Sequence, residues 1–237
     1  MALKQITDSV HQIPFFGGFL NIYLAERGDD LFIVDAGVNQ SNIDGVKKAL
    51  EQSGRSLDSV RAILVTHGHY DHIGGLAALQ RMAPNARTFV HRLDAPIVRG
   101  EQAVQPPKRE TLRGLSWLLS LMPVTATEPA KVDFEVKDGD VLDEVLPGLR
   151  VVELPGHSPG QVGYHWPARK LLFGGDVMMR LPGRLSMPIR AYTTDWETAK
   201  KSVKKVAALD LNILALGHGA PVIGDAGAKV KAFAQRF

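Results

Sequence analysis

Three histidines and one aspartate lie within six consecutive residues near the end of the first third of the chain. His67, His69, Asp71 and His72 directly follow the apolar run 62–65, which predicts that they leave the end of one buried strand together. Residues two apart in an extended chain point the same way, so His67 and His69 are placed to bind one metal ion while Asp71 and His72 face a second. The segment therefore predicts a metal site.

Glycines flank this segment where the chain has to turn. Gly68 separates the first two candidate ligands, and Gly74 and Gly75 permit a tight turn into a following helix. The alternative is a polar loop that is rich in histidine by chance. Ordinary loops do not place H-x-H-x-D-H between a buried strand and a glycine pair, so we favour the metal site.

Three more candidate ligands stand in the second half of the chain, each directly after its own apolar run. They are His157 in Pro-Gly-His-Ser-Pro-Gly, Asp176 after Gly-Gly, and His218 between two glycines. The apolar runs cover residues 149–154, 170–173 and 211–216. Three strands that each present one ligand at their end indicate one shared site.

Other polar residues receive a more ordinary interpretation. His91 and His165 lie in or beside strand-like runs, and we interpret both of them, with His11, as hydrogen-bonded structural residues. Asp35, which ends another apolar run, is either a cap for the following turn or an acceptor that orients a metal-binding histidine.

Composition limits the remaining possibilities. The 237 residues are 45% apolar and show no internal break, so we expect a single domain over residues 1–237. The net charge of +3 comes from scattered residues, which argues against nucleic acid or an anionic membrane as a partner. Because the chain has no cysteine, nitrogen and oxygen atoms must hold any metal. No signal-like or membrane-spanning apolar segment is present, so we expect a cytoplasmic protein.

Periodicity gives a coarse order of elements. Residues 10–13, 19–25 and 31–34 read as an antiparallel series of strands. Helices are predicted from capping boxes at 41–44 and 194–197, over residues 76–82, and at the end of the chain.

The segment from about residue 92 to 131 is the least regular part of the chain. It contains an apolar stretch, 112–122, that predicts a short helix. We expect this insertion to be either a lid over the substrate pocket or a dimer contact, although an ordinary core helix is the alternative.

The order of these motifs over nearly the whole chain resembles the metallo-β-lactamase superfamily. The resemblance implies an α/β (α+β) fold, an αββα sandwich of two mixed β-sheets face to face with helices outside. It also implies that one ion is held by His67, His69 and His157, a second by Asp71, His72 and His218, and that Asp176 bridges them.

The implied chemistry is hydrolysis by a hydroxide that bridges two divalent ions, with Asp71 as the catalytic group that orients it and passes a proton to the leaving group. The donor set suits Zn²⁺ best, with Mn²⁺, Fe²⁺ or Co²⁺ also accepted. The bridging Asp176 resembles the glyoxalase II and lactonase branch, not the true β-lactamases, and implies a carboxylic ester, lactone or thioester substrate with phosphoesters as a side activity. Met179 stands where acyl-homoserine lactonases carry a tyrosine, and Tyr192 is a candidate to replace it.

Apolar residues in the segments 92–131 and 178–192 predict a small-molecule substrate with an apolar acyl or lactone group. A homodimer is a further expectation if the helix in 112–122 is exposed. We also considered a mononuclear iron persulfide dioxygenase of the same fold, a nuclease, and a non-catalytic metal-binding module. The chain lacks a long basic insertion and has lost no ligand, so the dinuclear hydrolase is favoured.

Overall fold

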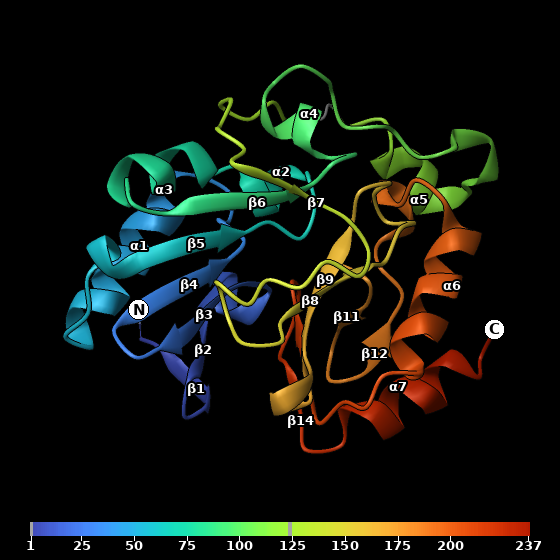
Figure 1. The fold of residues 1–237 in the computed structure, drawn as a ribbon. Helices are drawn as coiled ribbons and strands as arrows, with labels where there is room; N and C mark the ends of the chain where they lie inside the picture. The colour runs from blue at the N-terminus through green and yellow to red at the C-terminus, as the bar shows by residue number, and fades with distance from the viewer. Residues whose placement is uncertain (1, 123–124) are drawn as a thin grey trace.

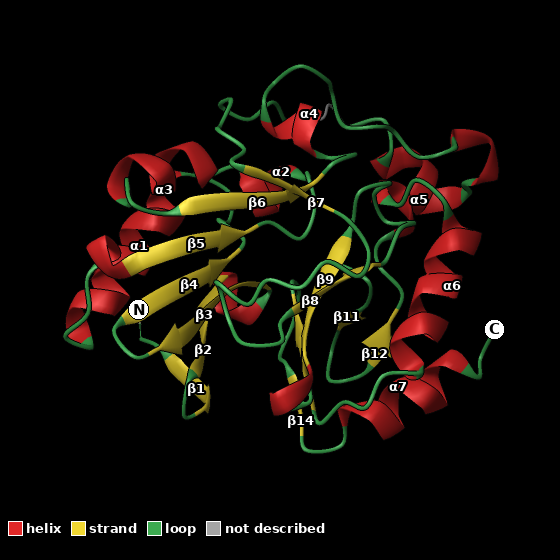
Figure 2. Cartoon of the chain, viewed as in Figure 1, coloured by secondary structure: helices red, strands yellow, loops and turns green. Residues whose placement is uncertain are grey.

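Two β-sheets lie face to face with helices on their outer sides in the computed structural model, which describes residues 2–122 and 125–237 (Figures 1 and 2). This arrangement confirms the predicted αββα sandwich. Both sheets are mixed, since each contains parallel and antiparallel neighbours.

The first sheet contains the N-terminal strands in sequence order. Its first four strands are antiparallel, and the following ones pair in parallel with β4 and with each other. The strands are β1 (Lys4–Thr7), β2 (Val10–Phe15), β3 (Leu20–Arg27), β4 (Asp30–Val34), β5 (Val60–Leu64), β6 (Arg87–His91) and β7 (Phe134–Val136). Three of them confirm the predicted antiparallel series, and β1 was not predicted.

The second sheet is built from the C-terminal half of the chain in the order β14-β13-β10-β9-β8. Its strands are β8 (Arg150–Glu153), β9 (Val162–Trp166), β10 (Leu171–Gly175), β13 (Ile213–Leu216) and β14 (Val222–Ile223). A small separate hairpin consists of β11 (Met179–Arg180) and β12 (Leu185–Ser186). The predicted ligand-bearing runs therefore correspond to β8, β10 and β13.

Three layers of apolar side chains hold the sandwich together. One layer packs the first sheet against α1 (Gln40–Gln52) and α3 (Leu76–Met82), and another packs the second sheet against α6 (Trp196–Ala207) and α7 (Ala226–Ala234). The middle layer joins the sheets, and its members include Phe32, Phe89, Tyr164 and Phe173. This core contains side chains from both sheets, and the single domain over residues 1–237 stays a prediction.

The predicted helices are present, but the predicted capping boxes are wrong. The first helix begins after Asn39, and Ser41 lies inside it. In α6 the cap is Asp195, whose carboxylate accepts a hydrogen bond from the N–H of Thr198, while the Thr194 hydroxyl bonds to the carbonyl of Gly156 instead. Both predicted helix starts lie within one or two residues of the observed ones, which is the usual uncertainty when a helix end is predicted from local sequence.

Replacing Asp195 by alanine is expected to lower the free energy of unfolding by about 1 kcal/mol, because the cap is lost. The hydrogen bond from Thr198 N–H, together with Lys108 3.0 Å away, lowers the pKa of Asp195 to about 2. A carboxylate with a lowered pKa stabilises the fold above its unfolded pKa and loses that effect as the pH falls. Urea unfolding at pH 7 and at successively lower pH should show the difference shrinking below about pH 4.

Asparagine at this position is the matched control, since it caps a helix about as well as aspartate but does not ionise. Asp195→Asn should keep most of the stability at pH 7. If Asp195→Asn lowered the free energy of unfolding as much as Asp195→Ala, the ion pair with Lys108, not the cap, would be the source of the stability.

The insertion predicted around residues 92–131 contains two short helices, α4 (Ala95–Val98) and α5 (Gly114–Leu119), and its residues 123 and 124 lie outside the described residues. The helix α5 is shorter than predicted and exposes apolar side chains, with Leu115 70% and Leu118 58% exposed. The lid and dimer-contact roles of this segment stay predictions, but the exposure excludes the ordinary core helix.

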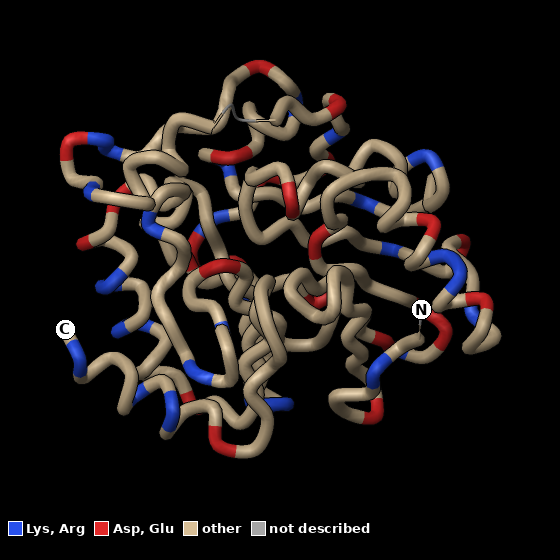
Figure 3. The backbone as a smooth tube through the Cα atoms, turned by 180° about the vertical axis from the view of Figure 1, so that it is seen from behind, with Lys and Arg blue, Asp and Glu red and all other residues tan. Residues whose placement is uncertain are grey.

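The remaining helices are short. They are α2 (Tyr70–Ile73) and the 3₁₀ turns η1 (Phe16–Gly18), η2 (Leu57–Ser59), η3 (Arg109–Thr111), η4 (Pro167–Arg169) and η5 (Arg190–Tyr192). Among the described residues, no helix is both long and apolar enough to cross a membrane. Charged residues of both signs are interspersed along the backbone (Figure 3).

Candidate metal centre

All seven residues predicted as metal ligands meet at one edge of the sandwich. They form three overlapping groups whose candidate ligand atoms lie within 4.8 Å of one another. The groups are His67, His69 and His157; His67, His72 and Asp176; and Asp71, His72 and His218. We call the first group the first cluster and the third group the second cluster.

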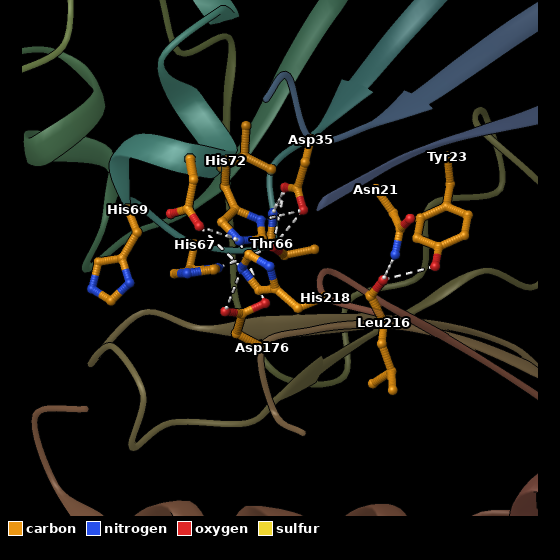
Figure 4. A network of polar contacts seen from close by, with 12 residues as sticks. Asn21, Tyr23, Asp35, Thr66, His67, His69, His72, Asp176, Leu216 and His218 are labelled. Carbon is orange, nitrogen blue, oxygen red and sulfur yellow. Dashed lines mark hydrogen bonds and ion pairs between the residues drawn. The ribbon is translucent and has the colours of Figure 1, made fainter. Parts of the chain in front are cut away.

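The two sheets contribute unequally to these clusters. The segment after β5 and the start of α2 supply four of the residues from the first sheet, and the loops after β8, β10 and β13 supply one each from the second. Side chains from both halves of the chain point toward one another in Figure 4. The site exists only because the ends of these strands meet at the same edge.

The first cluster consists of three imidazoles. His69 Nδ1 lies 2.9 Å from His157 Nε2, and the rings of His67 and His157 have centroids 5.0 Å apart. His67 and His157 are buried, and His69 is half-buried beside a cavity.

The second cluster combines two imidazoles with a carboxylate. His218 Nε2 lies 3.0 Å from Asp71 Oδ2, and His72 Nε2 lies 3.9 Å from the same oxygen. The Asp71 side chain is 37% exposed, so this carboxylate also faces solvent. An acidic group with one side toward ligands and one toward the cavity is suited to handle a proton.

Asp176 lies between the clusters. Its Oδ2 is 3.2 Å from His218 Nε2 and 3.5 Å from His157 Nε2, so one carboxylate oxygen contacts residues of both clusters. Its Oδ1 is 3.4 Å from His72 Nε2. A Cβ at Gly217 would collide with this carboxylate, which explains the glycine before His218.

Four of the five imidazoles have a second polar partner that fixes the direction of the ring. His72 Nδ1 lies 2.8 Å from Asp35 Oδ2, and His67 Nδ1 lies 3.1 Å from the hydroxyl of Thr66. The Nδ1 atoms of His157 and His218 similarly contact the hydroxyl of Thr193, at 3.2 Å, and the carbonyl of Phe19, at 3.0 Å. These contacts direct the four Nε2 atoms inward and fix the tautomer, as outer partners of metal-binding histidines do.

Asp35 therefore has the second of its two predicted roles. It is buried, and its carboxylate accepts hydrogen bonds from the N–H and the hydroxyl of Thr66 as well as contacting His72. Its φ of 63° is left-handed, which aspartate tolerates better than most residues.

The electrostatics of the two clusters differ. Burial and the neighbouring imidazoles lower the pKa of His67 well below its usual value, and burial together with His69 lowers the pKa of His157 to about 3. Burial also opposes protonation of His218, but Asp176 and Asp71 outweigh it and raise its pKa to about 10. Burial thus favours neutral imidazoles with free lone pairs in the first cluster, while Asp71 and Asp176 favour positive charge at the second.

Several buried atoms in this site have no hydrogen-bond partner among the described residues. They are His67 Nε2, His72 Nε2 and Asp176 Oδ1. An unpaired buried polar atom costs roughly 1–3 kcal/mol. A divalent cation bound by these atoms would remove that cost, and nitrogen and oxygen donors without thiolates suit Zn²⁺ and neighbouring divalent metals. The residues present therefore fit a metal.

An open cavity of about 510 Å³ lies over the clusters. His69, Asp71, His157, Asp176 and His218 reach it, and most of its remaining wall is apolar. The apolar wall includes Val104, Leu121, Met122, Met179 and Ile189. A cavity of this size holds a small organic molecule.

The other predicted site residues lie where a substrate could contact them. Met179 is buried and Tyr192 is 40% exposed, and both line the cavity. Tyr192 comes from η5 and its hydroxyl lies 3.9 Å from Met122 Sδ. Their roles in substrate binding stay predictions.

The histidines interpreted as structural lie outside the clusters. His91 contacts Glu153 at 2.8 Å, and His11 contacts Glu26 at 2.9 Å. His165 is half-buried on β9, but its Nε2 has no hydrogen-bond partner among the described residues, so the prediction of a hydrogen-bonded histidine is wrong for this residue.

Sequence reasoning missed residues that hold His218 in place. Asn21 donates hydrogen bonds to the carbonyls of Leu216 and Gly219, and the Tyr23 hydroxyl donates to the same Leu216 carbonyl at 2.7 Å (Figure 4). These bonds join β3 of the first sheet to the end of β13 in the second. Nothing in the local pattern distinguishes Asn21 or Tyr23 from other strand residues.

Known proteins share both the fold and the sequence pattern. The family model described as "Metallo-beta-lactamase superfamily" matches residues 16–218. A crystal structure of a metallo-beta-lactamase family protein from Thermus thermophilus superposes with a TM-score of 0.71 at 21% identity, covering 98% of this chain and 80% of that one. At that identity the match shows the fold.

Its relatives include hydrolases that are named for different activities. The probable metallo-hydrolase YflN of Bacillus subtilis is 28% identical over 86% of this chain and 80% of its own length. The acyl-coenzyme A thioesterase MBLAC2 of Bos taurus is 30% identical over 75% of this chain and 66% of its own length. A hydroxyacylglutathione hydrolase of Cereibacter sphaeroides is 29% identical over 74% of this chain, which spans 55% of that relative. The family model, these relatives and the shared fold show that the chain belongs to the metallo-beta-lactamase superfamily.

Proposed function

We propose that this protein is a dinuclear metal-dependent hydrolase that cleaves a carboxylic ester, lactone or thioester with an apolar acyl group. The observation that supports it most is the position of Asp176 between two clusters of candidate ligands on the floor of one cavity. A carboxylate shared in this way can bind two neighbouring ions at once.

His67, His69 and His157 would hold one ion, Asp71, His72 and His218 the other, and Asp176 both. Zn²⁺ is the proposed metal, because the donors are nitrogen and oxygen atoms in a site without cysteine. Two bound ions would supply a nucleophilic hydroxide near neutral pH and stabilise negative charge on the oxygen of the attacked carbonyl.

The protein itself supplies positioning and proton transfer. The outer partners of the imidazoles, Asp35 among them, hold the ligand atoms in place before substrate arrives. Asp71 borders the cavity and is partly exposed, so its carboxylate is placed to accept a proton from the attacking water and to return it to the leaving alcohol or thiol.

Substrate preference follows from the cavity wall. The apolar residues on η5 and after α5 favour an acyl chain in that part of the cavity, while Arg109 and a few polar residues line the rest. Relatives named as an acyl-coenzyme A thioesterase and a hydroxyacylglutathione hydrolase support thioesters as the first class to test. Tyr192 and Met179 are the residues that we expect to contact the substrate.

The test is elemental analysis of protein purified without added metal, with a panel of acyl thioesters, lactones and aryl esters assayed on the same sample. About two zinc or manganese ions per chain with turnover of at least one class would support the proposal. About one iron per chain without hydrolysis would overturn it.

Replacing Leu121 by aspartate is expected to lower kcat/KM for a medium-chain acyl substrate by about tenfold or more. Leu121 lines the cavity, and losing the contact of one leucine side chain costs about 1.5 kcal/mol or more, which corresponds to that factor. The value of kcat/KM for an acetyl substrate should fall less. Steady-state kinetics on acetyl and octanoyl members of one ester series measures the difference.

Leu115→Asp is the control, because Leu115 is exposed on the neighbouring helix α5 but does not line the cavity. This substitution should leave kcat/KM unchanged for both the acetyl and the octanoyl substrate. Equal losses for short and medium chains in Leu121→Asp would contradict an acyl site at this wall.

A further inference from the structure

The carboxylate of Asp94 joins two loops that are far apart in the sequence. Asp94 is completely buried. Its Oδ2 accepts hydrogen bonds from the N–H of Gly68 at 2.7 Å and from the hydroxyl of Ser158 at 2.9 Å, and its Oδ1 accepts one from the N–H of Gly160 at 3.0 Å. Gly68 lies between two imidazoles of the first cluster, and the other two donors directly follow the third. All three bonds therefore end on the loops that carry the first cluster.

The position of Asp94 in the chain does not explain these contacts. It is the N-cap residue of α4, where an aspartate side chain ordinarily accepts a hydrogen bond from its own helix, but here it makes none. Within the described part of the chain, the Asp94 carboxylate also has no ion-pair partner. A buried carboxylate without a counter-charge is costly, and the three hydrogen bonds to the ligand loops offset that cost.

The close approach of the second loop depends on a glycine. A Cβ at Gly160 would collide with the Asp94 carboxylate. The loop after His157 can therefore reach Asp94 only with glycine at this position.

We propose that Asp94 is a positioning residue that sets the spacing between the two loops of the first cluster and so determines how tightly that cluster binds its ion. The inference rests on the proposed function, because it assigns the cluster to a metal. None of the three hydrogen bonds of Asp94 ends on a loop that carries the second cluster, where Asp35 contacts His72 instead. Replacement of Asp94 should therefore weaken ion binding at the first cluster and leave ion binding at the second cluster unchanged.

Asparagine is a suitable replacement because it has nearly the same size but only one acceptor oxygen. Its NH₂ group would face a backbone N–H of Gly68 or Gly160, so at least one bond between the loops would be lost. Outer partners of metal-binding residues typically contribute 10–100-fold to metal affinity. We expect Asp94→Asn to weaken one of two Zn²⁺ affinities by about that factor.

The experiment measures both Zn²⁺ dissociation constants by competition with a chelator, for the wild type, Asp94→Asn and Asp35→Asn. His69→Ala and His218→Ala, each lacking part of one cluster, assign the two constants. Asp133→Asn is the matched control, because Asp133 also accepts a backbone N–H, from Thr88, but contacts neither cluster. The expected result is a selective loss of affinity at the first cluster in Asp94→Asn and no loss in Asp133→Asn. Asp35→Asn should weaken the second cluster most, because Asp35 contacts His72 directly but reaches His67 only through Thr66.

The inference would be overturned if Asp94→Asn and the wild type bound Zn²⁺ with equal affinities. It would also be overturned if both Zn²⁺ affinities fell equally, because that result indicates a general structural role. If Asp94→Asn does not fold, Ser158→Ala removes a single donor and should produce a smaller loss at the same cluster. A wild type that binds no metal would overturn both this inference and the proposed function. A wild type that binds two ions but hydrolyses nothing would overturn the function alone, and the ratio of the two affinities would still decide the role of Asp94.

Discussion

Replacing Asp176 by asparagine is expected to lower hydrolytic turnover by more than about 100-fold, the upper end of what outer partners of a metal site contribute. The carboxylate contacts His157 of the first cluster and His218 of the second, so its negative charge can balance ions bound at both. Asparagine removes that charge and turns an NH₂ group toward at least one of the sites. Metal content should fall below that of the wild type in the same preparation.

Asp44→Asn makes the same chemical change on the exposed side of α1 and should alter neither quantity. Comparison of kcat and zinc content in the two variants separates a site effect from a general one. Wild-type turnover in Asp176→Asn with two bound ions would contradict a bridging role.

Removing the metal is expected to abolish hydrolysis and to lower the melting temperature by roughly 5–10 °C. A ligand present at 100 times its dissociation constant stabilises the folded state by about 2.7 kcal/mol, and 1 kcal/mol shifts the melting temperature of a chain of this size by roughly 2–4 °C. His67 Nε2 and His72 Nε2 are buried and make no hydrogen bond within the described residues, so loss of the ion would leave both atoms without a ligand bond. Dialysis against a chelator, followed by calorimetry and by titration with Zn²⁺, Mn²⁺ or Co²⁺, measures both effects.

Readdition of metal should restore activity and melting temperature together. The Asp176→Asn variant provides the comparison, since its melting temperature should respond much less to added Zn²⁺. A melting temperature that is the same with and without metal in the wild type would argue against ions bound by these clusters.

The sequence predicted those features of the site that local patterns encode. His67, His69, Asp71 and His72 are close in the chain and follow a strand, so their convergence needs only one turn. Likewise, Ile43, Val46 and Leu50 lie three and four residues apart in the sequence, which is the spacing of one helix face, and all three are buried in α1.

Residues that act through long-range contacts could not be predicted in this way. Asn21 bonds to a carbonyl 195 residues away, and Asp94 bonds to a hydroxyl 64 residues away. In the sequence, Asp94 precedes Ala-Pro and has the ordinary pattern of a helix cap. Its role depends on the packing of α4 beside the loop after β8, which a single sequence does not specify.

Local sequence also gave the wrong helix cap where two neighbouring residues were both suitable. Thr194 and Asp195 are both good helix caps, and the choice between them depends on the contact of Thr194 with the Gly156 carbonyl in another loop. The helix α5 is shorter than its apolar stretch because the residues after it turn toward the cavity, where Leu121 and Met122 form part of the wall.

The division of the ligands between the two sheets has a consequence for the order of folding. His67 and His218 are separated by about 150 residues, and their clusters are complete only after the sheets have docked through the core that contains Phe32 and Phe173. Contacts that form after the rate-limiting step act on unfolding and leave refolding unchanged. We therefore expect a bound ion to slow unfolding of the assembled halves and to leave the rate of refolding unchanged.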